Sequence, residues 1–96
     1  MAVSTIKDRN IVMGDYAESE TVSVSNRGTT STTIDLSKSG YKLIGLSRLQ
    51  TSAVAQLGVT GYNINPDTDV LTVYLCGLIA GTATGKAVTR GVYIRD

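Results

Sequence analysis

The sequence predicts an all-β protein, a small antiparallel β-sandwich of jelly-roll type. Thirty of its 96 residues are Val, Ile or Thr, and branching at Cβ restricts these side chains in a helix but suits them to a pleated sheet. Short runs of alternating polar and apolar residues, separated by turn signals rich in Gly, Asn and Asp, recur from residue 20 onwards. Several short strands at such intervals are typical of sandwiches and small barrels.

Residues 1–19 mix charged with apolar residues and show no sustained period. We therefore expect two parts, an N-terminal arm over residues 1–19 and a sandwich domain over residues 20–96. The arm is expected either to be flexible or to dock on the body or on a neighbouring subunit through the apolar triplet Ile11-Val12-Met13. A short first strand over this triplet is the alternative.

Two alternating segments open the predicted sandwich, residues 20–25 and residues 30–36. The alternation places one set of side chains on a single face of each strand. The inward set is expected to be Val22, Val24, Thr32, Ile34 and Leu36. Because Asn26-Arg27-Gly28 is a turn signal between the segments, we predict consecutive antiparallel strands, followed by a loop at residues 37–40.

Residues 41–49 carry apolar side chains on both faces and allow two interpretations. As a helix, the segment would continue to residue 57 with an apolar stripe at a spacing of about 3.6 residues. That stripe would contain Leu46, Leu49, Ala53 and Leu57. As a strand, it would bury Leu43, Ile44 and Leu46, with Gly45 at a bulge or a close approach. We favour the strand, because Ile44-Gly45 starts a helix poorly.

Residues 56–65 predict a bulged strand, because the inward positions change parity near Gly61. The inward set is Leu57, Val59, Tyr62 and Ile64. Asn65-Pro66-Asp67-Thr68 then forms a turn in which the proline presets φ. Asp67 and Asp69 lie two residues apart, and we interpret them as solvated carboxylates rather than as calcium ligands.

Residues 70–76 and 87–94 are the longest β-branched and aromatic runs in the chain. We predict that they form an antiparallel hairpin across the glycine-rich turn at residues 80–85, at the centre of the core. Cys76 is expected to be a small buried residue of this hairpin. Tyr74 and Tyr93 fall opposite the apolar positions taken to face the core, namely Val73, Leu75, Val92 and Ile94. The two tyrosines are therefore candidate residues of an oligomer interface or a ligand platform.

Composition narrows the classes of function. The net charge is +1, with nine basic and eight acidic residues, so no nucleic-acid partner is expected. No apolar run approaches the roughly 20 residues of a membrane span, so no membrane insertion is expected. The chain has no histidine and one cysteine, so it offers neither an internal disulfide nor the common nitrogen ligands of zinc. We expect no catalytic residue, no cofactor, no metal and no enzymatic activity.

The size of the chain points to self-association. A chain of 96 residues without Phe or Trp buries only a modest core. Small domains are commonly reinforced by disulfides, metals or oligomerisation, and the residue inventory argues against the first two. We therefore expect a homo-oligomer.

The order of the segments resembles a class of short phage-encoded structural proteins. The similar pieces are Thr21-Val-Ser-Val-Ser, Ile34 to Leu46 with Ser37-Lys38-Ser39-Gly40-Tyr41-Lys42 inside it, a Tyr-Asn-Ile strand and the closing Val-Thr-Arg-Gly-Val-Tyr-Ile strand. Together they span residues 20–96 and look like the β-sandwich heads of phage fibres, tail tips or capsid-associated spikes. The resemblance carries no functional residues across, since it is a pattern of segments.

This resemblance implies a virion component, made in the host cytoplasm, that acts in assembly or host attachment. It favours a homotrimer. The partners that it implies are other virion proteins and a host-surface receptor or glycan. The alternative function is a carbohydrate-binding or adhesion module of a cellular protein.

Overall fold

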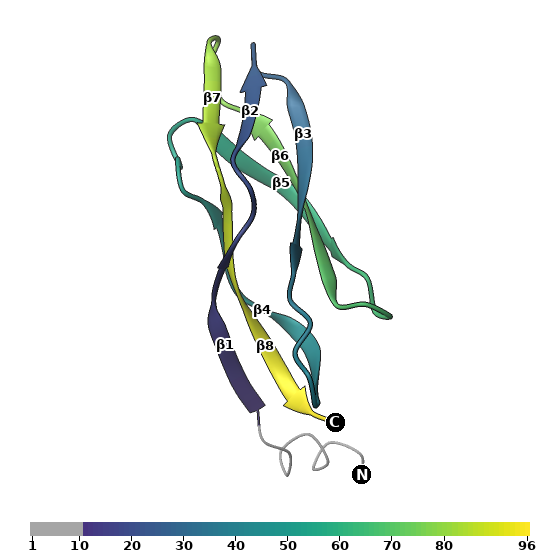
Figure 1. Cartoon of the computed structure of the whole chain (residues 1–96). Helices are drawn as coiled ribbons and strands as arrows, with labels where there is room; N and C mark the ends of the chain where they lie inside the picture. Colours follow the sequence, from purple (N-terminus) through teal and green to yellow (C-terminus); the bar gives the residue numbers. More distant parts are fainter. Residues whose placement is uncertain (1–10) are drawn as a thin grey trace.

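The computed structural model describes residues 11–96, which form eight β-strands and no helix (Figure 1). In chain order the strands are β1 (Ile11–Glu18), β2 (Val22–Ser25), β3 (Thr29–Asp35), β4 (Tyr41–Thr51), β5 (Leu57–Ile64), β6 (Val70–Gly77), β7 (Thr82–Gly85) and β8 (Ala87–Arg95). They pair into three antiparallel sheets: sheet A in the order β1-β8-β4, sheet B with β2-β7, and sheet C in the order β3-β6-β5. The prediction of the all-β class is confirmed.

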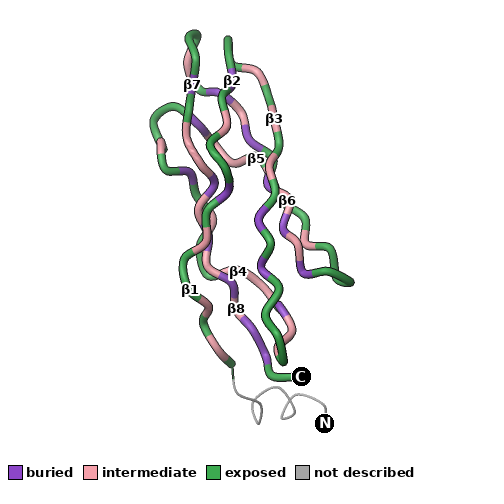
Figure 2. Tube along the Cα trace, in the orientation of Figure 1, coloured by how far each residue is buried: buried purple, intermediate pink, exposed green. Residues whose placement is uncertain are grey.

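Sheets A and C share the main hydrophobic core. Its buried residues are Ile34, Leu36, Leu43, Leu71, Val73, Leu75, Ala87 and Tyr93. Figure 2 shows buried residues along β6 and β8, the central strands of the two sheets. Sheet B extends from one end of the molecule, where Val24, Leu57 and Ala83 form a second, smaller cluster. The described fold is elongated, with extents of 51 × 24 × 20 Å.

The two long runs predicted as one hairpin belong to different sheets. The first forms β6, between β3 and β5, and the second forms β8, between β1 and β4. The glycine-rich segment between them is more than a turn, because Thr82–Gly85 forms β7 and pairs with β2. The hairpin prediction is therefore wrong. Each run has the composition of a central strand, but local sequence does not specify the partners that a strand pairs with.

The prediction that residues 20–25 and 30–36 form neighbouring strands is also wrong. β2 pairs with β7 and β3 pairs with β6, so the turn between them carries the chain from sheet B to sheet C. Asn26 and Arg27 both have left-handed φ angles, 54° and 56°, and the N–H of Gly28 donates to the carbonyl of Ser25 at 3.0 Å. The predicted turn is present, and the inward positions Ile34 and Leu36 are buried as expected.

Part of the expected arm is a strand of sheet A. Residues 11–18 form β1, which runs antiparallel to β8 from the pair Ile11–Ile94 to the pair Glu18–Val88. Ser19 is buried beside it and exchanges hydrogen bonds of 2.9 Å with Ala87, one through its N–H and one through its hydroxyl oxygen. The strand corresponds to the alternative kept open for the apolar triplet, and residues 1–10 lie outside the described residues.

β4 and β5 are edge strands that contain bulges. The strand interpretation of residues 41–49 is correct, and the register of β4 against β8 slips between Leu43 and Gly45. Leu43 is buried but Ile44 is 49% exposed, so the expectation that both faces are covered is wrong. In β5 the register slips between Val59 and Gly61, which confirms the predicted bulge. Tyr62, expected to face inward, is exposed because β5 lies at the edge of sheet C.

Candidate functional site

Tyr93, one of the two tyrosines predicted to point outward, lies in the core. Its side chain is 5% exposed, and its hydroxyl donates to the Leu36 carbonyl at 2.6 Å. A Cβ added to Gly14 would lie only 2.7 Å from the Tyr93 ring, and a Cβ added to Gly91 would lie 2.8–2.9 Å from the Tyr93 hydroxyl and ring. The outward placement is therefore wrong: the space left by two glycines accepts the ring, and the hydroxyl finds an acceptor. Burial raises the pKa of the Tyr93 hydroxyl above its ordinary value, and the carboxylates of Asp69 and Asp35 raise it further.

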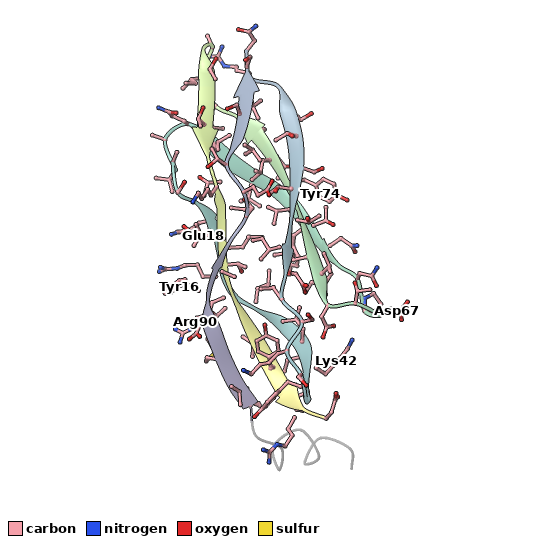
Figure 3. The ribbon with its side chains drawn as sticks, in the orientation of Figure 1. Tyr16, Glu18, Lys42, Asp67, Tyr74 and Arg90 are labelled. Carbon is pink, nitrogen blue, oxygen red and sulfur yellow. The ribbon has the colours of Figure 1, made fainter. Side chains whose placement is uncertain are left out.

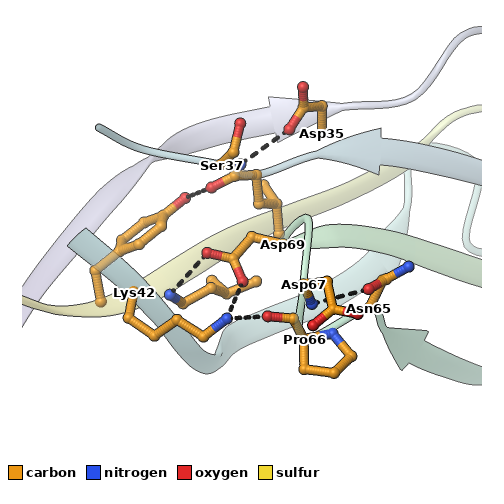
Figure 4. A network of polar contacts seen from close by, with 10 residues as sticks. Asp35, Ser37, Lys42, Asn65, Pro66, Asp67 and Asp69 are labelled. Carbon is orange, nitrogen blue, oxygen red and sulfur yellow. Dashed lines mark hydrogen bonds and ion pairs between the residues drawn. The ribbon is translucent and has the colours of Figure 1, made fainter. Parts of the chain in front are cut away.

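Asp69 links the loop before β6 to β4 in sheet A (Figure 4). Its carboxylate is buried and accepts hydrogen bonds from the Lys42 ammonium at 2.8 Å and from the Leu43 N–H at 3.2 Å. The Lys42 ammonium also donates to the Pro66 carbonyl. Asp67 lies apart from this pair, and its N–H donates to the Asn65 side chain at 2.9 Å, which is the local turn bond expected of Asn. The Asp69 carboxylate thus joins the two facing sheets, and its interpretation as a solvated carboxylate is wrong.

Tyr74, the second predicted interface residue, does point outward. It is 46% exposed on the outer face of sheet C, between its cross-strand neighbours Ser31 on β3 and Gly61 on β5. The surrounding outward positions carry small polar side chains, namely Thr29, Thr33, Asn63 and Thr72. Cys76 lies on this same outer face and is partly exposed, so its prediction as a buried core residue is wrong. The structure does not bring Tyr74 and Tyr93 together, because they lie on opposite faces of different sheets.

The outer face of sheet A gathers exposed apolar side chains that the sequence did not single out as one surface. Ile11, Met13 and Ile44 are 53%, 45% and 49% exposed. Met13 pairs with Val92, which is partly exposed on the same face, whereas Ile94, the partner of Ile11, is buried at 9% exposure. Ile44 is the extra residue of the β4 bulge, next to Gly45, which also pairs with Val92. We call this surface the sheet A patch, made of Ile11, Met13, Ile44 and Val92.

The sheet A patch is bounded by a basic and aromatic region farther along the same face. Tyr16 is 60% exposed, and its ring lies under the Arg90 guanidinium at 5.5 Å, a cation–π contact. Arg90 stands directly opposite Arg48 of β4. Like charges at opposite positions of a sheet repel each other, so this end of the face favours acidic groups. Figure 3 shows Tyr16 and Arg90 on the side of β1 and β8, with Tyr74 on the other side of the molecule.

The alternation within Ile11-Val12-Met13 was the available signal for this surface. In β1, Val12 pairs with Tyr93 and packs against the core, whereas Ile11 and Met13 point outward. An apolar residue on both faces of an edge strand indicates that the outer face has a role as well. The sequence marked the triplet as a docking element, but its partner strand could not be known.

Residues 11–96 contain no group of three or more His, Cys, Asp or Glu side chains that could hold a metal ion. None of their elements is a helix long and apolar enough to cross a membrane. Comparisons with family models, with curated proteins and with solved structures found no match to the chain.

Proposed function

We propose that the protein is a non-enzymatic structural component of a phage particle, which self-associates through the sheet A patch and acts in assembly or host attachment. The observation that carries the self-association is the run of exposed apolar side chains along one sheet face, with Ile11, Met13 and Ile44 each about half exposed. Covering such side chains stabilises an assembly by on the order of 1 kcal/mol for each half-exposed group. A second copy presents the same face and so covers the patch on both partners.

The phage assignment rests on the resemblance of residues 20–96 to the heads of fibre, tail-tip and capsid-spike proteins, and the resemblance also favours a trimer. A jelly-roll form of the sandwich is supported by the pairs β1–β8, β2–β7 and β3–β6, which are nested along the chain. A long hairpin rolled up on itself, as in a jelly roll, makes nested pairs of this kind. β4 and β5, at the tip of that hairpin, pair with β8 and β6 rather than with each other.

A carbohydrate-binding or adhesion module is the second candidate, and Tyr74 is the observation that favours it. The ring is exposed in the middle of a sheet face rich in hydroxyl groups, and an aromatic ring beside hydrogen-bonding side chains suits a sugar. Binding to a glycan array that Tyr74→Ala abolishes would support this function.

Mass measurement by light scattering at low micromolar concentration tests the proposed self-association. Met13→Lys places a charge at the centre of the patch and is expected to lower the mass of the assembly, in which one chain contributes 10.1 kDa. Tyr74→Lys is the matched control, because the two side chains are equally exposed, 45% and 46%, on different sheets. A wild-type protein that is monomeric at this concentration, or equal effects of the two substitutions, would overturn the proposal.

A further inference from the structure

β3 differs from the other edge strands of the two three-stranded sheets. The ladders of β1, β4 and β5 each contain a register irregularity, between Met13 and Tyr16, at two places in β4, and between Val59 and Gly61. The ladder between β3 and β6 is regular over all seven residues of Thr29–Asp35. Bulges and charges are the usual devices that prevent an edge from pairing with another chain. β3 has no bulge, no proline and a single charge, at Asp35.

The free backbone groups of β3 can be identified from the hydrogen bonds at its two ends. The carbonyl of Gly28 accepts from the N–H of Gly77, and the N–H of Leu36 donates to the carbonyl of Asp69, both on the β6 side. Backbone groups alternate in direction along a strand, so the even-numbered residues bond to β6. The groups that point away belong to the odd-numbered residues Thr29, Ser31, Thr33 and Asp35. Within residues 11–96, none of these four makes a backbone bond outside the ladders.

We propose that β3 is a strand-addition site and that its occupant is β3 of a second copy, paired antiparallel about a two-fold axis at Thr32. This inference rests on the proposed self-association, but it uses sheet C rather than the sheet A patch. The two-fold axis sets Ser31 opposite Thr33 of the partner subunit, so short hydroxyl side chains meet along the outer face. Each of the four odd-numbered residues then stands opposite an odd-numbered residue of the partner subunit. Their N–H and C=O groups, which point away from β6, are all paired across the contact.

Charge supports this register. Asp35 is the only charged residue of β3, and the two-fold pairing places it opposite Thr29 of the partner subunit. The turn with Arg27 lies two residues before Thr29. Asp35 of each copy therefore stands two residues along the strand from Arg27 of the other, and no like charges stand opposite each other. In an isologous contact of this kind, each favourable pair of residues occurs twice.

The two contacts lie on different sheets, so both can form at once. The patch joins copies through the face of sheet A, and β3 joins two sheets C edge to edge. Together they connect copies beyond a single closed unit, as an assembly component requires. Each contact can be removed without touching the other.

Amide hydrogen exchange, resolved by residue with NMR, tests the pairing directly. The amides of Thr30, Thr32 and Ile34 are expected to be protected at every protein concentration. The amides of Thr29, Ser31 and Thr33 are expected to exchange fast in dilute protein and at least about tenfold more slowly in concentrated protein. Equally fast exchange of the odd-numbered amides under both conditions, in protein that is oligomeric, would overturn the inference and leave the patch contact standing.

Ser31→Pro provides a second test, with Ser31→Ala as its matched control. Proline removes an outward N–H and is tolerated at the edge of a sheet, whereas alanine keeps that N–H. We expect Ser31→Pro to lower the mass to that of the patch-linked unit and Ser31→Ala to leave it unchanged. Met13→Lys is expected to leave the β3-linked pair, and the double variant is expected to be a monomer. A mass unaffected by Ser31→Pro would contradict strand addition, whereas a monomeric wild type would contradict both contacts.

Discussion

Replacing Tyr93 by Phe removes one hydrogen bond from the core while keeping the ring in place. The Tyr93 hydroxyl donates to the Leu36 carbonyl at 2.6 Å, and Leu36 is only 4% exposed. The substitution therefore leaves a buried acceptor without its partner, which costs about 1–3 kcal/mol. This loss is a large fraction of the roughly 5–15 kcal/mol that stabilises a typical domain.

Urea unfolding followed by circular dichroism measures this loss. With a slope of about 1–3 kcal/mol per molar urea for a small protein, we expect the midpoint to fall by roughly 1 M. Tyr74→Phe is the matched control, because Tyr74 is 46% exposed and surface substitutions usually change stability by less than about 0.5 kcal/mol. All variants are compared at one protein concentration, because association raises apparent stability. Equal midpoints for the two variants would refute the role assigned to the Tyr93 hydroxyl.

Three further predictions concern the same region. Because the pKa of Tyr93 is raised in the folded state, the wild type is expected to lose stability as the pH rises above about 10, where the tyrosine of the unfolded chain ionises first. Urea unfolding at pH 9 and 11 measures this loss, and an equal loss of stability in the Tyr93→Phe variant would contradict the prediction. Asp69→Asn replaces the charged acceptor of Lys42 and Leu43 and is expected to lower the free energy of unfolding by about 1 kcal/mol, with Asp67→Asn, in the exposed part of the turn, as the unaffected control. Gly91→Ala places a Cβ within 2.9 Å of the Tyr93 ring and hydroxyl and is expected to destabilise the protein by about 1–3 kcal/mol. If the variant unfolded thermally at the same temperature as the wild type, the ring would be able to move aside and the prediction would be wrong.

The positions of most strands could be predicted from the sequence because each strand is a local pattern, but β7 lies in a segment predicted to be a turn. The alternation in residues 30–36 placed Ile34 and Leu36 inward, and both are buried. The glycine in residues 56–65 marked a bulge, and the register does slip before Gly61. The partners of the strands could not be predicted, because β8 pairs only with segments more than 30 residues away, and β6 pairs with such a segment as well as with the nearby β5. No local pattern distinguishes a hairpin from two strands in facing sheets.

The prediction that Val92 faces the core and Tyr93 faces outward was wrong for a related reason. Val92 and Ile94 are the more apolar set, but Tyr93 fills a space that Gly14 and Gly91 leave in two different strands. Because Gly14 and Gly91 are 77 positions apart in the sequence, neither local segment shows that the two glycines together leave this space. Consequently Val92 stands on the outer face with Met13 beside it, whereas Ile94 is buried as expected. The same inversion that buried Tyr93 therefore created the apolar patch on sheet A.

The most direct test of self-association through the sheet A patch is an isotope-filtered NMR experiment on a mixed sample. Half of the chains carry labelled methyl groups and half are unlabelled, so that only contacts between different copies give a signal. The patch contact predicts intermolecular signals from the methyl groups of Met13, Ile44 and Val92, and none from Val73 or Leu75, which are fully buried inside one copy. An oligomer that gives no intermolecular signal from Met13, Ile44 or Val92 would contradict the patch as its interface.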